Sequence, residues 1–435
     1  MKKNIVMAAV IAVITLTSAV YSQNKFKGNL TLNEAIQLAL KNQPLITQAE
    51  QEVNAAEAKI NEQKSFEYPN VEADISYARI GPIPAIQFGN ESFILAPANN
   101  YDAHVSAGYN IFDFGRKNAL LDLTKSYKLT AQEKTNYIKD KLSYNTTKLF
   151  YSILYLEKNL DVKNDQIKTL ETHLDVTQKK VDSGTATDFE VLTTKVRVAS
   201  AENQKFDIEN EINKQKIALN SLMGLPADTP LDLQGDLSLL SMRVNNDSLL
   251  DLAYSQREEL KIAQDAQRSI EQQKQVASLS NAPTLNAIAS YGLKNGLMPN
   301  LDVLRGNWVV GISANIPIFN GNRKDAQIQE ADANLNANDA QISALKRKID
   351  MEVQQAVSDL ETSKAKLKST QLQVDQAAEA VKRAEVSYIN GVITNLDLLD
   401  AETSLSEAKL LHLRVIYQNV VNAYNLKEAI GDVIR

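Results

Sequence analysis

Residues Tyr388 to Ala401 read YINGVITNLDLLDA, and this stretch decides the fold of the chain. A long helical pattern of apolar residues, starting at Arg323, runs into it. Gly391 supplies the permissive backbone that a helix end needs, and Thr394 is placed as the N-cap of a returning helix. The stretch therefore predicts the tip of a helical hairpin at about residues 389–395.

A near copy of this tip occurs 207 residues earlier, at Val181–Leu192, with the sequence VDSGTATDFEVL. The glycine, the capping threonine and the acidic residue keep their spacing, at Gly184, Thr187 and Glu190. The helices that enter the two tips carry apolar residues every seven positions at the same offset, namely Ile153, Leu160, Ile167, Leu174 and Val181, then Leu360, Leu367, Val374, Val381 and Tyr388. A strict seven-residue repeat implies supercoiled packing. We therefore predict two long coiled-coil hairpins, the first with its tip at about residues 182–188.

Four segments replace the helical pattern with strict alternation of apolar and polar residues. They predict strands at about 70–78, 103–112, 284–292 and 308–318, in two hairpins. Each strand has one apolar and one polar face, which fits a sheet that separates two different solvents. The first hairpin has a loop rich in Pro and Asn, from about Gly81 to Asn100.

The chain divides into a leader and two repeats. Residues 1–22 resemble a secretory signal peptide, with Lys2 and Lys3 before the apolar run Ile5–Leu16. A membrane anchor is the alternative, but that run is shorter than the roughly 20 residues of a span. The first repeat is expected at 23–226, an equatorial insert at 227–246, the second repeat at 247–431 and a tail at 432–435.

Composition excludes several classes of protein. The formal net charge of −6 gives no reason to expect nucleic-acid binding. The chain has no cysteine, which excludes disulfides and thiolate metal sites. Its three histidines lie far apart, at His104, His173 and His412, and no phosphate-binding or nucleophile motif is present. We therefore expect no enzyme activity, no metal and no cofactor.

Four strands cannot close a barrel, and an open sheet edge in hydrocarbon leaves backbone groups unpaired. If the strands enter a membrane, several chains must share one barrel, and three chains would give twelve strands. The alternative is a soluble sheet packed on the helices. A soluble sheet would require a more uniformly apolar core face, and it would not explain a signal peptide.

The order helix, strand hairpin, long helix, tip and helix, occurring twice, resembles the TolC-like outer-membrane efflux protein family. The resemblance covers Thr31–Gly431, and its most specific piece is Gly391–Ala401. Weaker matches are Leu222–Pro226 and Ile316–Phe319, followed by Gly321. The resemblance implies a mainly α protein with a membrane β part, in which a trimeric 12-stranded barrel continues as an α-helical tunnel.

The same resemblance implies a function and its partners. The protein would be a passive exit duct of a tripartite efflux or type I secretion system, in the outer membrane of a Gram-negative bacterium and extending into the periplasm. Its partners would be two further copies in a homotrimer, a periplasmic adaptor (membrane fusion) protein, an inner-membrane pump and outer-membrane lipid. Drugs, metals and secreted proteins all remain open as cargo.

The family also implies functional residues at the tips. Asp397 and Asp400 match positions that ring the periplasmic entrance, where six carboxylates would favour cations. The simpler reading is that Asp397 complements a helix N-terminus, worth under about 1 kcal/mol. The tip turns are expected to dock the adaptor, through Gly184, Thr185, Thr187, Gly391, Val392 and Thr394, although turn geometry alone would explain these residues. The family's closing salt bridge needs a basic residue near the second tip, and Val392 and Ile393 offer none.

Two other classes remain open. A periplasmic adaptor also has a long coiled-coil hairpin, but it has one hairpin between β-rich domains. A fibrous coiled-coil protein would lack the paired strands and the prolines at matching positions.

Overall fold

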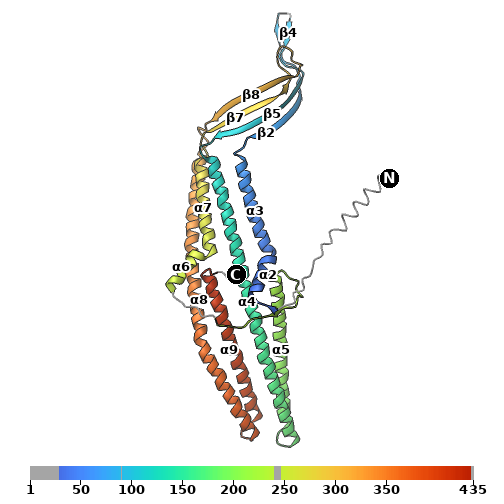
Figure 1. Ribbon diagram of the computed structural model, residues 1–435, viewed down its shortest axis with the longest axis vertical. Helices are drawn as coiled ribbons and strands as arrows, with labels where there is room; N and C mark the ends of the chain where they lie inside the picture. The colour runs from blue at the N-terminus through green and yellow to red at the C-terminus, as the bar shows by residue number, and fades with distance from the viewer. Residues whose placement is uncertain (1–28, 90, 240–245, 433–435) are drawn as a thin grey trace, which may run out of the picture.

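The computed structural model describes residues 29–89, 91–239 and 246–432. The predicted signal peptide, residues 240–245 of the predicted insert and residues 433–435 lie outside this part of the chain. Figure 1 shows an elongated molecule with a sheet at one end and two helical-hairpin tips at the other. None of the described helices carries an apolar stretch sufficient to cross a bilayer.

Two helices of 67 residues, α4 (Arg116–Asp182) and α8 (Arg323–Ile389), run from the sheet to the tips. Each is roughly 100 Å long at 1.5 Å per residue. Shorter helices accompany them. The tip halves pair with α5 (Asp188–Leu222) and α9 (Asn395–Ala429). The sheet halves pair with α3 (Pro44–Ser65) and α7 (Glu258–Ser278).

The accompanying helices on the sheet side are broken near the middle of the molecule. The helical pattern of apolar residues continues from Thr31 to about Phe66, whereas α2 (Leu32–Asn42) ends before Pro44 starts α3. Proline lacks an N–H and fits only the first turn of a helix, so it separates the two. The same division occurs at Arg257, between α6 (Asn246–Gln256) and α7, although the helical pattern of the sequence continues from Ser248 to about Leu279.

Four antiparallel strands form the main sheet in the order β2-β5-β7-β8. They are β2 (Asn70–Arg79), β5 (Asn99–Phe112), β7 (Thr284–Lys294) and β8 (Arg305–Asn315). The predicted strand 308–318 was wrong at its end, because β8 stops at Asn315. Pro317 has no N–H to donate to a ladder, so the apolar residues Ile316 and Ile318 do not continue the strand.

The loop between β2 and β5 is partly regular. It contains a small hairpin of β3 (Ala85–Phe88) and β4 (Glu91–Ile94), which projects beyond the main sheet. The Phe88 and Phe93 rings lie edge to face, with centroids 6.3 Å apart. The predicted loop therefore contains a small hairpin that its Pro and Asn content does not indicate.

The hydrophobic core is concentrated at the middle of the molecule, where the two repeats have equivalent clusters. One joins α4 and α5 through Phe150, Ile153 and Leu219; the other joins α8 and α9 through Leu360 and Leu426. The short strands β1 (Asn29–Leu30) and β6 (Asp232–Leu233) pair in parallel beside the first cluster. Both clusters lie midway between the sheet and the tips, so they hold each long helix to its partners.

Candidate functional site

The register of the main sheet gathers apolar residues on one face and polar residues on the other. One row across the four strands is apolar, namely Val71, Ala107, Ala289 and Val310. A row of opposite orientation is polar, namely Asp74, His104, Gly292 and Asn307. Within the described residues no helix lies across either face (Figure 1), and Ile75 and Trp308 on the apolar face are 87% and 71% exposed. A single chain therefore leaves a large apolar surface uncovered.

The polar face carries charged groups close together. The His104 Nδ1 atom lies 3.0 Å from Asp102 Oδ1, and its Nε2 atom lies 3.6 Å from Asp74 Oδ2. The register also aligns Asp102 with Lys294 and Arg305 on the neighbouring strands. This face can meet water and ions, in contrast to the opposite face.

At the other end of the molecule, the two tips have matching turns. Gly184 and Gly391 have φ values of +74° and +72°, a conformation that glycine adopts without a steric penalty. Thr394 caps α9: its N–H and its hydroxyl donate to Asp397 Oδ2 at 2.8 and 2.6 Å. Thr187 makes the same pair of contacts with Glu190 Oε1 in the first tip, both at 3.4 Å.

The two predicted entrance carboxylates have different environments. Asp397 belongs to the cap, and the hydrogen bonds from the Thr394 hydroxyl and N–H lower its pKa. Asp400 instead meets Arg197 of α5, whose Nη2 lies 3.3 Å from Asp400 Oδ1. Sequence reasoning missed Arg197 because it searched only the second tip for a basic residue. The repeat offset was the available signal: Arg197 lies one helical turn beyond Thr193, the first-repeat equivalent of Asp400.

A buried polar network joins the first hairpin to the second just above the tips. His173 Nε2 lies 2.6 Å from Asn395 Oδ1. Lys180 donates to the Tyr388 carbonyl at 2.8 Å, and its Nζ lies 3.9 Å from the centroid of the Tyr388 ring. Burial, followed by the charge of Lys180, lowers the pKa of His173 and favours the neutral ring. The network holds α4 against the end of α8 and the start of α9.

Only some of the residues predicted to dock a partner have side chains that are free to contact one. Thr187 and Thr394 are occupied as caps, and the two glycines form the turns. Thr185 is exposed, although its hydroxyl donates to the Lys180 carbonyl at 3.1 Å. Val392 is 75% exposed. Further apolar side chains that the prediction missed are exposed beside these turns, namely Phe189, Leu192, Val196, Val386 and Ile389.

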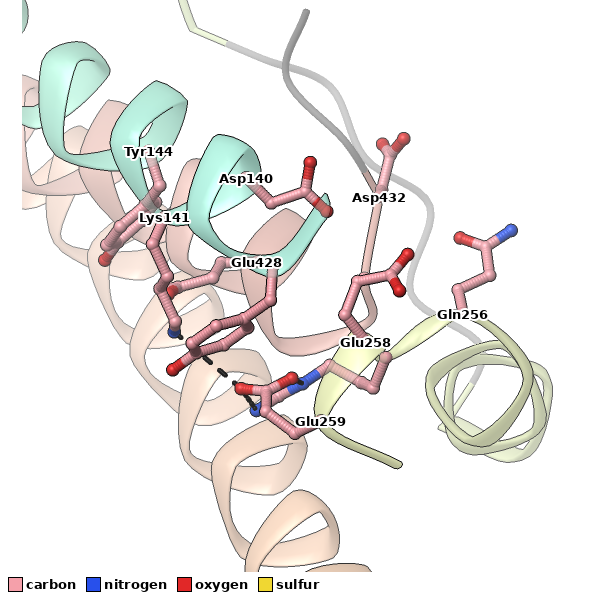
Figure 2. Close-up of a pocket in the computed structure, with 11 residues that line it drawn as sticks. Asp140, Lys141, Tyr144, Gln256, Glu258, Glu259, Glu428 and Asp432 are labelled. Atoms are coloured by element: carbon pink, nitrogen blue, oxygen red, sulfur yellow. Dashed lines mark hydrogen bonds and ion pairs between the residues drawn. The ribbon is translucent and has the colours of Figure 1, made fainter. Parts of the chain in front are cut away.

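A charged cluster fixes the middle of the molecule, where α6, α7 and the end of α9 meet α4 (Figure 2). The Arg257 guanidinium, only 5% exposed, contacts Glu259 at 2.9 Å and Glu352 at 2.7 Å and donates to the Ala429 carbonyl. Lys141 contacts Glu428 at 2.6 Å. The contacts of Arg257 with Glu352 and with the Ala429 carbonyl, and of Lys141 with Glu428, each join different elements, so the cluster is a structural junction. No described group of histidine and acidic residues could hold a metal ion.

Comparisons with known proteins agree with this architecture. The family model described as outer membrane efflux protein matches residues 35–225 and 249–432. The outer membrane protein TolC of Escherichia coli (strain K12) is 23% identical over 348 residues, covering 72% of this chain and 67% of that protein. The proteases secretion protein PrtF of Dickeya chrysanthemi is 23% identical over 290 residues, covering 64% of this chain and 61% of that protein.

Solved structures confirm the predicted fold of the chain. The outer membrane protein VceC of Vibrio cholerae superposes with a TM-score of 0.78 at 20% identity, covering 92% of this chain and 96% of that chain. The Campylobacter jejuni CmeC outer membrane channel also gives 0.78, at 16% identity, covering 92% of this chain and 85% of that one.

Proposed function

Because the chain belongs to the outer membrane efflux protein family, we propose that three copies assemble into one continuous conduit. The protein lies in the outer membrane and is an exit duct for efflux or secretion. The observation that supports the assembly is the sheet itself. Its two faces differ in polarity, and its outer strands, β2 and β8, each pair on one side only within the described chain.

The open edges require partners in a bilayer. Each unpaired N–H or C=O in hydrocarbon costs several kcal/mol. Pairing β2 of one copy with β8 of the next satisfies both edges, and three copies make a ring of twelve strands, an even number of the kind found in outer-membrane proteins. The apolar face then meets lipid, and the polar face with His104 and its neighbours lines the pore.

The helices continue the conduit into the periplasm. Each copy contributes two long helices with stacked shorter partners, which form a wall roughly 100 Å deep. The proposed duct is passive, as the resemblance to the family implies. Energy and cargo selection then belong to an inner-membrane pump, which an adaptor protein connects to the duct.

The tips form the proposed periplasmic entrance. Asp397 and Asp400 from three copies would place six carboxylates around a narrow mouth, which favours cations. Asp400 is balanced by Arg197, whereas Asp397 receives only uncharged donors from Thr394. We therefore assign most of the cation preference to Asp397.

The same ends present the proposed adaptor surface. Thr185 and Val392 lie on the turns formed by Gly184 and Gly391, beside the exposed apolar side chains of α5 and α8. Apolar residues at a helical tip, rimmed by polar ones, suit the end of another coiled-coil hairpin. Thr187 and Thr394 contribute indirectly, by fixing the turn geometry.

Fractionation and electrophysiology test the proposal together. The expected result is a detergent-resistant trimer in the outer membrane fraction that forms cation-preferring channels in planar bilayers. A soluble monomer without channel activity would contradict it. For the entrance, the change of Asp397 and Asp400 to Ala should reduce cation preference, and unchanged conductance and selectivity would reject that assignment.

A further inference from the structure

Helix α9 packs against both α4 and α8 along a line that we call the seam. Between the tips and the central core, these three helices line a partly open cavity of about 50 Å³. It is lined by Val162, Asp165, Gln166 and Thr169 of α4, Val381 of α8, and Glu402, Leu405, Ser406 and Lys409 of α9. The cavity is large enough for water.

Glu402 is a buried acid at this cavity. Its residue is only 7% exposed, and its Oε2 atom has no hydrogen-bond partner within the described structure. The charged groups that face it are Asp165 from α4, Glu385 from α8 and Lys409 from its own helix. Lys409 lies two turns further along α9, and none of the described ion pairs includes Glu402. An ionised carboxylate at this position would be buried without compensation.

The nearest buried cation does not supply that compensation. Lys163 of α4 is 5% exposed and donates to two amide oxygens, Gln166 Oε1 at 2.7 Å and Gln204 Oε1 at 2.8 Å. Gln166 also accepts a hydrogen bond from Ser406 at 2.9 Å, so this amide stands between Lys163 and α9. Lys163 is therefore satisfied by amide oxygens of α4 and α5, and it makes no ion pair with Glu402 in the described structure.

The protonation of Glu402 follows from this environment. Burial, reinforced by the negative charge of Glu385, raises the pKa of Glu402 to about 7 from its ordinary value of 4.5. The packed seam keeps the Glu402 carboxyl neutral below about pH 7. A solvated carboxyl loses its proton near pH 4.5, so the stability that the proton gives to the packed form is fully present below pH 4.5. It declines as the pH rises through about 7.

We propose that Glu402 is a proton-binding site that holds the second hairpin against the first, and that loss of its proton releases α9 from α4. The site takes a proton and nothing larger, and it responds in the range from weakly acidic to neutral pH. The seam is a property of one chain. Only the consequence for the conduit, a wider entrance at higher pH, rests on the proposed function.

The absence of cysteine allows a direct measurement of the seam. Spin labels at Thr172→Cys on α4 and Ser404→Cys on α9, both exposed positions, would be the only thiol-bound groups in the protein. Distances between the two labels are recorded by pulsed electron paramagnetic resonance from pH 5 to pH 9. The expected result is a short distance at pH 5 and a longer, broader distribution at pH 9, with the packed fraction falling about tenfold or more.

Three variants make the result specific. Glu402→Gln keeps the shape of the neutral acid, so the short distance should persist at every pH. Glu385→Gln removes the nearby negative charge, so the transition should move to lower pH. Glu361→Gln, an exposed position on α8, should leave the transition unchanged.

Each outcome decides the inference. A distance that does not change with pH in the labelled parent protein overturns it, as does a Glu402→Gln variant with the parent's transition. Circular dichroism at both pH values establishes that the variants remain folded. Because the distance is measured without current flow, a protein that moves as expected but forms no channel would refute the proposed function and leave this inference standing.

Discussion

The Arg197 guanidinium lies 3.3 Å from the Asp400 carboxylate, and this contact joins the first helical hairpin to the second beside the tips. The two side chains are 41% and 62% exposed, so the contact is worth less than about 1 kcal/mol in stability. Its larger effect is on the local field, because it neutralises one of the two acidic groups that each copy places at the proposed entrance.

Replacing Arg197 by Ala should therefore raise the preference for cations, because Asp400 loses its positive neighbour. The reversal potential across a KCl gradient in planar bilayers measures this. Asp400→Asn should lower the preference. Because the fields of the two charges add, the Arg197 change should raise the cation preference by a similar amount in an Asp400→Asn background, and no shift in either background would show that Arg197 does not act on the entrance. The melting temperature should stay nearly constant in all three variants.

The N-terminal cap of α9 should depend on both Thr394 and Asp397. Thr394→Ala removes the hydroxyl contact with Asp397 and should cost about 1 kcal/mol in local stability. Amide hydrogen exchange should become faster in the first turns of α9. Thr187→Ala is the matched control, since it should affect the start of α5 alone. Uniform exchange changes in both helices would argue against separate caps.

Acid should weaken the same cap. The pKa of Asp397 is lowered by its bonds with Thr394, so its contribution is present above its ordinary value of 3.8 and is lost as the pH falls further. Exchange in the first turn of α9 should therefore accelerate below about pH 4, and Asp397→Asn should remove this pH dependence.

Substitutions of buried residues in the central core should lower the stability of the protein most. Leu360 of α8 is fully buried, and Leu360→Ala should lower the free energy of unfolding by about 2–5 kcal/mol. Leu372→Ala makes the same change on the same helix at a side chain that is 55% exposed, and it should cost under about 1 kcal/mol. Denaturant unfolding in detergent compares them, and similar losses would contradict the central core.

Arg257 should be far more important than an exposed arginine. Arg257→Ala leaves Glu259 and Glu352 without their buried partner and should cost about 3–5 kcal/mol. Arg383→Ala removes an exposed contact with Glu379 on α8 and should change stability by less than about 1 kcal/mol. The same unfolding experiment applies. An Arg257 variant as stable as the Arg383 variant would mean that the junction is dispensable.

The architecture could be predicted from the sequence because the periodic patterns of helices and strands are local. Alternation located four strands, and the seven-residue repeat with its two glycine tips located the long helices. What failed depended on single backbone groups or on distant contacts. Pro317 ends β8 in spite of an apolar alternation around it, and the β3–β4 hairpin forms inside a loop whose Pro and Asn content does not indicate it.

The contacts of the candidate site were harder to predict. The caps at Thr187 and Thr394 follow from neighbouring residues, so the sequence showed where they lie. Arg197 and Asp400 are 203 residues apart, and only the packing of the hairpins brings them together. The break between α6 and α7 at Arg257 could not be predicted, because no proline or glycine marks it. The backbone of Arg257 is extended there, and its side chain is buried.

The two edge strands of the sheet also affect how the protein reaches its folded state. A newly synthesised copy carries two exposed edges, at β2 and β8, and either edge can pair with any extended chain that it meets. Correct association therefore competes with aggregation throughout the passage from synthesis to the membrane. The helical hairpins, rich in local contacts, should fold early, whereas in the proposed assembly the sheet is completed only by neighbouring copies. The yield of finished conduits should consequently rise with the local concentration of copies and with any chaperone that covers the edges in transit.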